Sequence, residues 1–153
     1  MATRPTRIVS GGQTGVDRAA LDAAIALGIP HGGWCPRGRS AEDGPIPDRY
    51  ELIETDSTEY RVRTERNVLD SDATLILFRE RIGGGTELTL RLARQHGRPH
   101  LAIDLDDPPS SDEFHAWMQT NQVGVLNVAG PRESQNPDIA AAAQWFLQTM
   151  FEA

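Results

Sequence analysis

Short apolar runs alternate along this chain with stretches in which apolar residues recur every three or four positions. The apolar runs predict strands at residues 7–10, 73–78, 100–105 and 123–128, with shorter strands at 29–34 and 50–54. The helical periodicity predicts helices at 15–27, 56–70 and 86–96, a short one after Ser110, and a last one from Asn136 to Met150. Strands that alternate with helices are typical of βαβ units, so the expected fold class is α/β with a mostly parallel sheet. The length of 153 residues favours one domain that covers residues 1–153.

Local signals refine the ends of these elements. Gly28 is a stop signal for the first helix, and Asn136 with Pro137 is a start signal for the last. Asp56 with Glu59, and Ser110 with Glu113, have the spacing of helix-capping pairs. The proline-rich segment 35–49 is expected to be the longest loop.

Three loops that contain glycine each follow a predicted strand and precede a helix. The first comprises Gly11, Gly12, Gln13, Thr14 and Gly15. The second comprises Gly83, Gly84, Gly85 and Thr86, and the third runs from Ala129 to Ser134. Open parallel sheets bind ligands beyond the carboxyl ends of their strands, so the three loops are expected to lie at one edge of the sheet.

Such loops suit the binding of an anion. The first N–H groups of a helix have no partner within the helix and carry about half a positive charge. Glycines allow a close approach of the backbone and the positive φ angles that direct several N–H groups to one point. We therefore expect the first two loops to hold the phosphate of a small ligand. Thr14 and Thr86 can add hydroxyl donors, although helix capping explains both threonines equally well.

Composition narrows the chemistry further. All 15 basic residues are arginine, so neither a Schiff-base lysine nor a P-loop lysine exists. The formal net charge of −7 argues against binding of duplex nucleic acid. The first loop is not Gly-x-Gly-x-x-Gly, and no acid ends the second strand. Both features argue against a conventional dinucleotide-dependent dehydrogenase.

Arginine remains the candidate for gripping phosphate, because its guanidinium group binds phosphate in bidentate fashion. The candidates are Arg132 and Ser134 in the third loop, Arg66 with its neighbour Asn67, and Arg37 in the proline-rich loop. An exposed arginine in a surface ion pair is the alternative for each. Asp17 and Glu87 are the candidate catalytic acids, and their alternative role is a favourable charge in the first turn of a helix.

The remaining features indicate a cytoplasmic protein. No run approaches the roughly 18 apolar residues of a membrane span, and no apolar segment of a signal peptide precedes the first strand. Cys35 is the single cysteine, so an internal disulfide is excluded. His31 lies four residues before it without a further cysteine or histidine nearby, and no metal site is expected.

Taken together, several segments resemble the putative molybdenum carrier family. They are SGGQTGVDR at 10–18, WCPRGR at 34–39, AEDG at 41–44, TERNV at 64–68, SDATL at 71–75, GGGT at 83–86 and NVAGPR at 127–132. This family is similar to the lysine-decarboxylase-like, Lonely Guy group of nucleotide-binding domains. The resemblance implies a Rossmann-like, doubly wound sheet with helices on both faces. It also implies a homo-oligomer, a dimer or tetramer, that holds a nucleotide-like or molybdopterin-like ligand over the glycine loops.

The resemblance leaves two functions open. The first is a carrier or sensor of a phosphorylated nucleotide-like ligand or of the molybdenum cofactor, without a nucleic-acid or membrane partner. The alternative is a nucleotide N-glycosidase, because hydrolases of the wider group carry Pro-Gly-Gly-x-Gly-Thr-x-x-Glu. Here Thr89 stands at the position of that glutamate and the nearby acid is Glu87, whereas Arg66 resembles the arginine partner of those enzymes.

Overall fold

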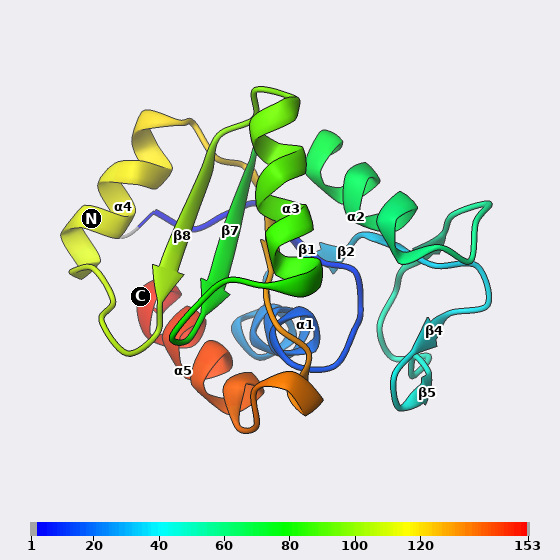
Figure 1. Cartoon of the computed structure of the whole chain (residues 1–153). Coiled ribbons are helices and arrows are strands. Elements are labelled where there is room, and N and C mark those ends of the chain that lie inside the picture. The colour runs from blue at the N-terminus through cyan, green and yellow to red at the C-terminus, as the bar shows by residue number, and fades with distance from the viewer. Residues whose placement is uncertain (1–2, 153) are drawn as a thin grey trace.

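The computed structural model describes residues 3–152, and in them a five-stranded parallel sheet forms the centre of the protein. From edge to edge the strands are β2 (His31–Gly32), β1 (Arg7–Val9), β9 (Val125–Ala129), β7 (Ala73–Phe78) and β8 (His100–Asp104). The helices are α1 (Val16–Leu27), α2 (Tyr60–Leu69), α3 (Gly84–Gln95), α4 (Ser111–Thr120) and α5 (Ile139–Phe151), with a 3-10 turn η1 (Glu133–Gln135) (Figure 1). The predicted α/β, Rossmann-like class is confirmed.

β9 lies in the middle of the sheet although it follows the other four strands along the chain. Its residue Leu126 is opposite Ile8 of β1 on one side and Ala73 of β7 on the other. Counted from β9, the strand order becomes 3-2-1-4-5, which is the order of the Rossmann fold. The direction in which the strands are added reverses between β9 and β7, and ligands of such sheets bind at this switch point.

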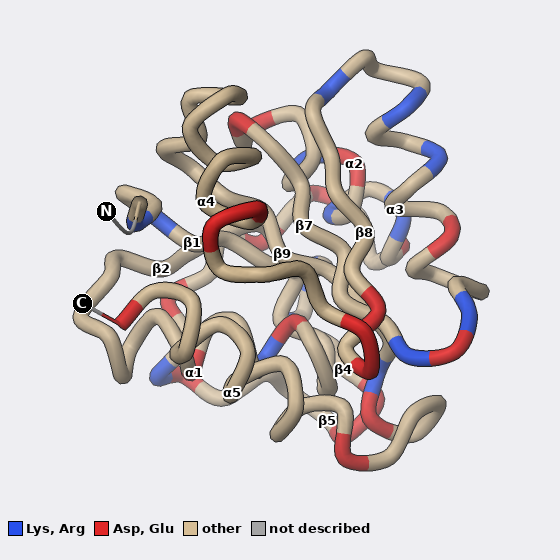
Figure 2. The backbone as a smooth tube through the Cα atoms, turned by 90° about the vertical axis from the view of Figure 1, so that its left-hand side faces the viewer, with Lys and Arg blue, Asp and Glu red and all other residues tan. Residues whose placement is uncertain are grey.

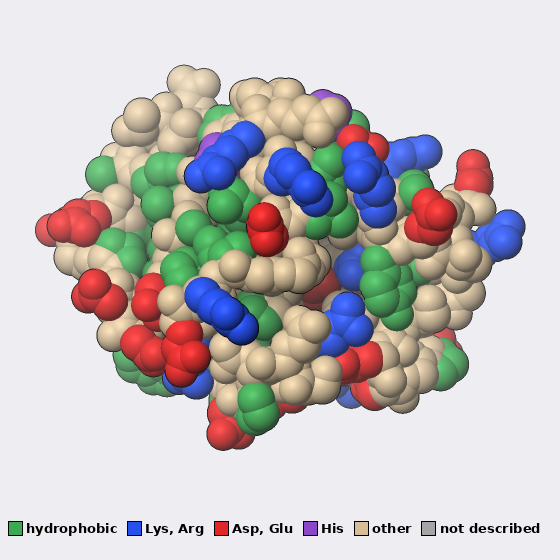
Figure 3. Space-filling model, viewed as in Figure 1, with side chains coloured by type: hydrophobic (Ala, Val, Ile, Leu, Met, Phe, Trp, Pro, Cys, Tyr) green, Lys and Arg blue, Asp and Glu red, His purple; other side chains and the backbone are tan. Residues whose placement is uncertain are grey.

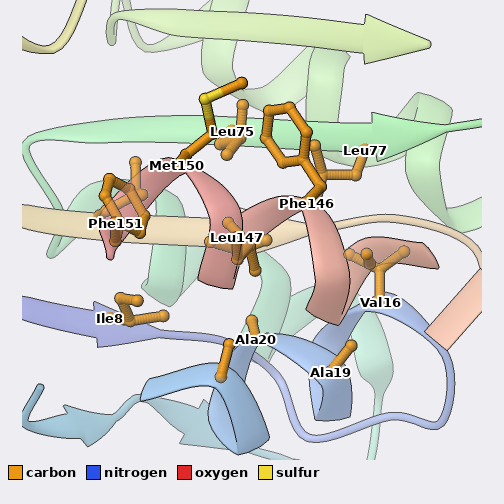
Figure 4. Close-up of a cluster of buried hydrophobic side chains, with 14 of the residues drawn as sticks. Ile8, Val16, Ala19, Ala20, Leu75, Leu77, Phe146, Leu147, Met150 and Phe151 are labelled. Carbon is orange, nitrogen blue, oxygen red and sulfur yellow. The ribbon is translucent and has the colours of Figure 1, made fainter. Parts of the chain in front are cut away.

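Helices cover both faces of the sheet, as expected. α1, α4 and α5 contribute to one core with the strands, and α2 packs beside α3 on the opposite face. In Figure 4, Phe146 of α5 lies beside Leu77 of β7, and Leu147 of α5 lies on the side of Ala20 of α1. Small alanine side chains allow α1 and α5 to approach closely, and β7 is buried on both faces as its apolar sequence predicts.

The two shorter predicted strands are placed differently from expectation. Segment 29–34 divides into β2 and β3 (Trp34–Cys35), because Gly33 at φ 124° redirects the chain. β3 pairs with β6 (Ile53–Glu54) in a separate two-stranded sheet, and β6 is the only part of the predicted strand at 50–54 that forms a strand. This sheet carries the chain away from the main one.

The segment predicted as the longest loop is partly ordered by a small hairpin of β4 (Ser40–Ala41) and β5 (Gly44–Pro45). Arg18 holds the hairpin through both carboxylate oxygens of Asp43, at 2.5 and 2.8 Å. Leu21, Cys35, Ile46 and Tyr50 form a second small core below it. The hairpin is therefore fixed to α1.

Two predicted helix starts are wrong and one is confirmed. α2 begins at Tyr60 without a side-chain cap, because Ser57 accepts the N–H of Glu59 and forms a local turn there. α5 begins at Ile139, since the Glu133 carboxylate accepts the N–H groups of Asp138 and Ala140. Ser110 caps α4 as predicted, accepting the N–H of Glu113 at 3.1 Å.

Charge is distributed unevenly over this fold. Residues 60–98 contain eight arginines and five acidic residues, whereas the chain as a whole has a net charge of −7. Arginines gather along α3 in the backbone view of Figure 2, and Figure 3 shows arginine side chains on the face formed by α2 and α3. None of the helices in the described residues is long and apolar enough to span a membrane.

Candidate functional site

A cleft of about 80 Å³ lies at the carboxyl ends of the central strands, at the switch point of the sheet. Its walls come from the loop after β1, the inner face of α2, the first turn of α3 and the loop after β9. Pockets that enclose drug-sized ligands have roughly 300–1,000 Å³. The cleft can therefore enclose a small group such as an oxyanion, and a larger ligand would extend out of it.

A buried ion pair forms the inner wall of the cleft. Arg63 of α2 places Nη1 3.2 Å from Oδ2 of Asp17, and their side chains are only 10% and 9% exposed. Its Nε donates to the carbonyl of Tyr60, and Nη2 bonds to no residue that the structure describes. A Cβ at Gly11 would lie 1.8 Å from Nη1, so only glycine leaves room for this guanidinium group.

The partners of Asp17 compensate only part of the cost of burying its charge. Burial raises the pKa of Asp17 above its ordinary value of 3.8, and the charge of Arg63 offsets part of that effect. The backbone N–H of Gln13 also donates to Oδ2, at 3.2 Å. The carboxylate thus fixes both an arginine and the loop after β1.

Gln13 lines the cleft, and the oxygen and the nitrogen of its side-chain amide differ in their hydrogen bonds. Its Oε1 accepts the N–H of Thr14 at 3.1 Å and the N–H of Glu42 at 2.8 Å. Its Nε2 is buried and has no hydrogen-bond partner among the described residues. Buried donors without a partner are rare, so this amide is a candidate for contact with a ligand.

The first turn of α3 supplies the most open backbone donors. Gly83 caps this helix without a side-chain hydrogen bond, and Gly85 and Thr86 line the cleft. Thr86 is 5% exposed and lies deepest in this turn. The helix dipole makes this end of α3 favourable for negative charge.

The loops after β1 and β9 interlock at the rim. Val16 donates its N–H to the carbonyl of Pro131, and a Cβ at Gly15 would lie 2.2 Å from that oxygen. Gly15 has φ 80°, so both the conformation and the contact require glycine. Thr14 accepts the N–H of Glu133 and bonds through its hydroxyl to Glu42.

Glu42 reaches this rim from the hairpin β4–β5. It accepts the N–H of Ser134 at 3.2 Å and the hydroxyl of Ser134 at 2.5 Å. The bond from the Ser134 hydroxyl, followed by that from Thr14, lowers the pKa of Glu42 below its ordinary value. A carboxylate of the protein therefore occupies donors of the third loop that were expected to serve a ligand.

The structure brings about half of the residues predicted from the sequence to the cleft. Those that line it are Gly11, Gln13, Asp17, Asn67, Gly85, Thr86 and Arg132. Gly12, Thr14, Gly15 and Ser134 lie in the loops behind it, and Gly83 and Gly84 line a neighbouring hollow of about 410 Å³ that also contains Arg79 and Arg81. The cleft is thus lined by only some of the residues in each predicted loop.

One expectation about the first loop needs correction. The N–H groups of Gln13, Thr14 and Val16 already bond to Asp17, to the Gln13 side chain and to Pro131. The tight turn uses these donors to hold its own shape, so they are not available together for an anion. The helix start of α3, which has no side-chain cap, and the side chains on the inner wall remain as candidate donors to an anion.

Three predicted residues lie away from the cleft. Arg66 is exposed and stacks its guanidinium group 4.9 Å from the ring centre of Trp34, on the outer side of α2. Arg37 and Glu87 are also exposed and do not line the cleft. Asp17 is therefore the candidate acid that the fold places at the site.

Sequence reasoning missed Arg63 and Tyr60. Both line the cleft, and the guanidinium carbons of Arg63 and Arg132 lie 5.1 and 5.9 Å from the ring centre of Tyr60. Arg63 is four residues before Asn67, so a 3.6-residue period places the two on one helix face, and Arg66 on another. That spacing was the signal that could have found it.

No cluster of metal ligands accompanies the cleft. Among the described residues, no three His, Cys, Asp or Glu side chains come together as a set that could hold a metal ion. Cys35 is buried in the small core under the hairpin, and burial raises the pKa of its thiol. The donors of the cleft are suited to an oxyanion.

Comparison with known proteins agrees with the geometry of the fold. The model of the circularly permutated YpsA SLOG family matches residues 8–151. The chain is also similar to a putative molybdenum carrier protein from Syntrophus aciditrophicus SB, known from a crystal structure. The two share 46% sequence identity with a TM-score of 0.93 over 100% of this chain and 98% of the other. No curated protein matches the chain significantly.

Proposed function

The chain belongs to the circularly permutated YpsA SLOG family, and from this premise we propose that it is a carrier or sensor of a phosphorylated ligand. The ligand is nucleotide-like or pterin-like, and its phosphate lies in the cleft between β9 and β7. The observation that carries the proposal is that a buried arginine, Arg63, lines the same cleft as Gln13, whose amide nitrogen has no partner among the described residues, and as the first turn of α3. These groups are donors that match phosphate oxygens.

The cleft is large enough to enclose only one part of such a ligand. About 80 Å³ suffices for the phosphate, so the heterocycle would lie outside, where Tyr60 and Arg132 border the cleft. An aromatic ring and a guanidinium group both stack favourably on planar heterocycles. The molybdenum cofactor, a phosphorylated pterin, fits this division, and the similar protein from Syntrophus carries a molybdenum carrier name.

The test is calorimetric titration of the wild-type protein with nucleoside monophosphates and with the matching nucleosides. We expect binding of a monophosphate and much weaker binding of its nucleoside. At a free ligand concentration of 100 times Kd, the free energy of unfolding rises by about 2.7 kcal/mol. For a chain of this length that raises Tm by roughly 5–11 °C. Equal binding of a monophosphate and its nucleoside would contradict the placement of phosphate in the cleft.

One observation favours a second candidate, a nucleotide N-glycosidase. Asp17 is a carboxyl group at the cleft whose pKa burial raises, and a raised pKa suits a general acid. In that case Asp17, and not the exposed Glu87, would donate the proton to the departing base. Release of free base from a monophosphate, lost in Asp17→Asn and retained in Glu87→Gln, would establish the enzyme. Binding without any release of base supports the carrier.

A further inference from the structure

The side-chain amide of Gln13 has one end fixed by the protein and one end without a partner among the described residues. Oε1 accepts two backbone N–H groups, from Thr14 at 3.1 Å and from Glu42 at 2.8 Å. Both partners are donors only, so they require the oxygen of the amide and exclude its nitrogen. The orientation of the amide therefore follows from its partners, and Nε2 must point away from them.

The open end is buried and unsatisfied. Gln13 is 7% exposed and lines the cleft, and its Nε2 has no hydrogen-bond partner among the described residues. A buried donor of this kind is unfavourable until an acceptor reaches it. Gln13 lines the same enclosed space as Arg63 and Thr86.

The second fixing bond comes from the hairpin β4–β5, which is far from Gln13 in sequence. The hairpin is itself anchored by Asp43 on Arg18 and by Glu42 on Ser134. Rotation of the Gln13 amide would break both bonds to Oε1 and leave two backbone donors unpaired. The fold thus presets Gln13 as a donor before any ligand arrives.

We infer that Gln13 determines ligand specificity: its preset amide N–H₂ group donates to an acceptor oxygen of the ligand and selects an ionised oxyanion for the inner end of the cleft. The inference rests on the proposed function, because it names the contact by which that site recognises its phosphate. A ligand group that presents only a donor at this point would leave both itself and Nε2 unsatisfied. Such groups are therefore rejected.

The test is Gln13→Glu, with Gln95→Glu as the matched control. Glutamate keeps the shape of glutamine, and one carboxylate oxygen can still accept both backbone N–H groups. The other oxygen then faces the phosphate as a negative charge. Gln95 is exposed at the last position of α3 and does not line the cleft, so its substitution adds the same charge away from the site. The probe is AMP, titrated calorimetrically at pH 8 and at pH 5.5, with thermal unfolding as the check of folding.

At pH 8 we expect Gln13→Glu to bind AMP at least 30-fold more weakly than wild type, and Gln95→Glu to bind within about threefold of wild type. At pH 5.5 the Gln13→Glu ratio should recover by a factor of ten or more, because a protonated carboxyl group is again a donor. A purely structural role of Gln13 would not produce this recovery. If wild type binds AMP and the two variants behave alike at both pH values, the inference is wrong and the proposed function stands. If wild type binds none of the monophosphates, both are overturned.

Discussion

Substitution of Arg63 by methionine removes the positive charge from the inner wall of the cleft and keeps most of the aliphatic stem. The variant leaves Asp17 buried without its partner at 3.2 Å. Removal of one member of a buried pair costs about 3–5 kcal/mol, against a typical free energy of unfolding of 5–15 kcal/mol. We expect the variant to fold with a clearly lower stability. Arg66→Met is the control, because Arg66 lies on the same helix but is exposed over Trp34.

The pH dependence of this loss has a definite sign. The folded pKa of Asp17 lies above 3.8, so the native state binds the proton more tightly than the unfolded chain. The contribution of Asp17 to the free energy of unfolding therefore rises as the pH falls through its folded pKa. Arg63 lowers that pKa, and its removal raises the pKa further. The penalty of Arg63→Met relative to wild type is thus largest above the folded pKa of the variant. It then decreases by about 1.4 kcal/mol per pH unit until the folded pKa of wild type is reached.

Urea denaturation between pH 5 and pH 9 measures the stability part, and titration with AMP measures the binding part. Loss of one charge-assisted hydrogen bond, at about 1.5–3 kcal/mol, corresponds to affinity lower by roughly 10- to 150-fold. Asp17→Asn combined with Arg63→Met should be less destabilised at high pH than Arg63→Met alone, since no buried charge remains. Equal effects of Arg63→Met and Arg66→Met on stability and on affinity would refute the assignment of the inner wall.

Three further substitutions probe the walls of the cleft. Gly85→Val should fold normally, because nothing lies within 4 Å of its Cβ position, but it should weaken AMP binding at least tenfold in calorimetry. The control Gly83→Val has an equally open Cβ position outside the cleft, and it should bind AMP as wild type does. Gly15→Ala should lower the free energy of unfolding by about 2 kcal/mol more than Gly38→Ala in urea denaturation, because both positions have positive φ but only Gly15 faces a backbone oxygen at 2.2 Å. Arg132→Ala should weaken a monophosphate and its nucleoside by similar factors in paired titrations, because Arg132 borders the heterocycle; a clearly larger loss for the monophosphate would mean that Arg132 contacts the phosphate instead.

Local pattern was sufficient for much of this fold and for one part of the site. The apolar run ATLILF is typical of a strand buried on both faces, and it forms β7, which is buried at all but its last residue. The glycines before α3 mark a helix start, and Gly85 and Thr86 do border the cleft. Such features depend on neighbours in sequence, and for that reason a pattern reveals them.

The rest depends on contacts between distant segments. The central position of β9 follows from pairing with two strands that precede it by about 50 and 120 residues, which no local pattern encodes. The bond of Gln13 to the Glu42 N–H crosses 29 positions and needs the hairpin in place. To predict that Arg63 lines the cleft and Arg66 does not, one must know which face of α2 is turned toward the sheet. Each is a tertiary effect that overrides local signals.

The position of β9 also governs the order in which the protein can be completed during synthesis. β1 with β2 and β7 with β8 are two separate parallel pairs, and the only hydrogen-bonded link between the pairs in the described sheet is β9. The ribosome makes this strand after the other four, so the two pairs cannot join into one sheet until β9 has been made. The cleft spans the same seam, so its walls come together only when β9 has paired with both β1 and β7.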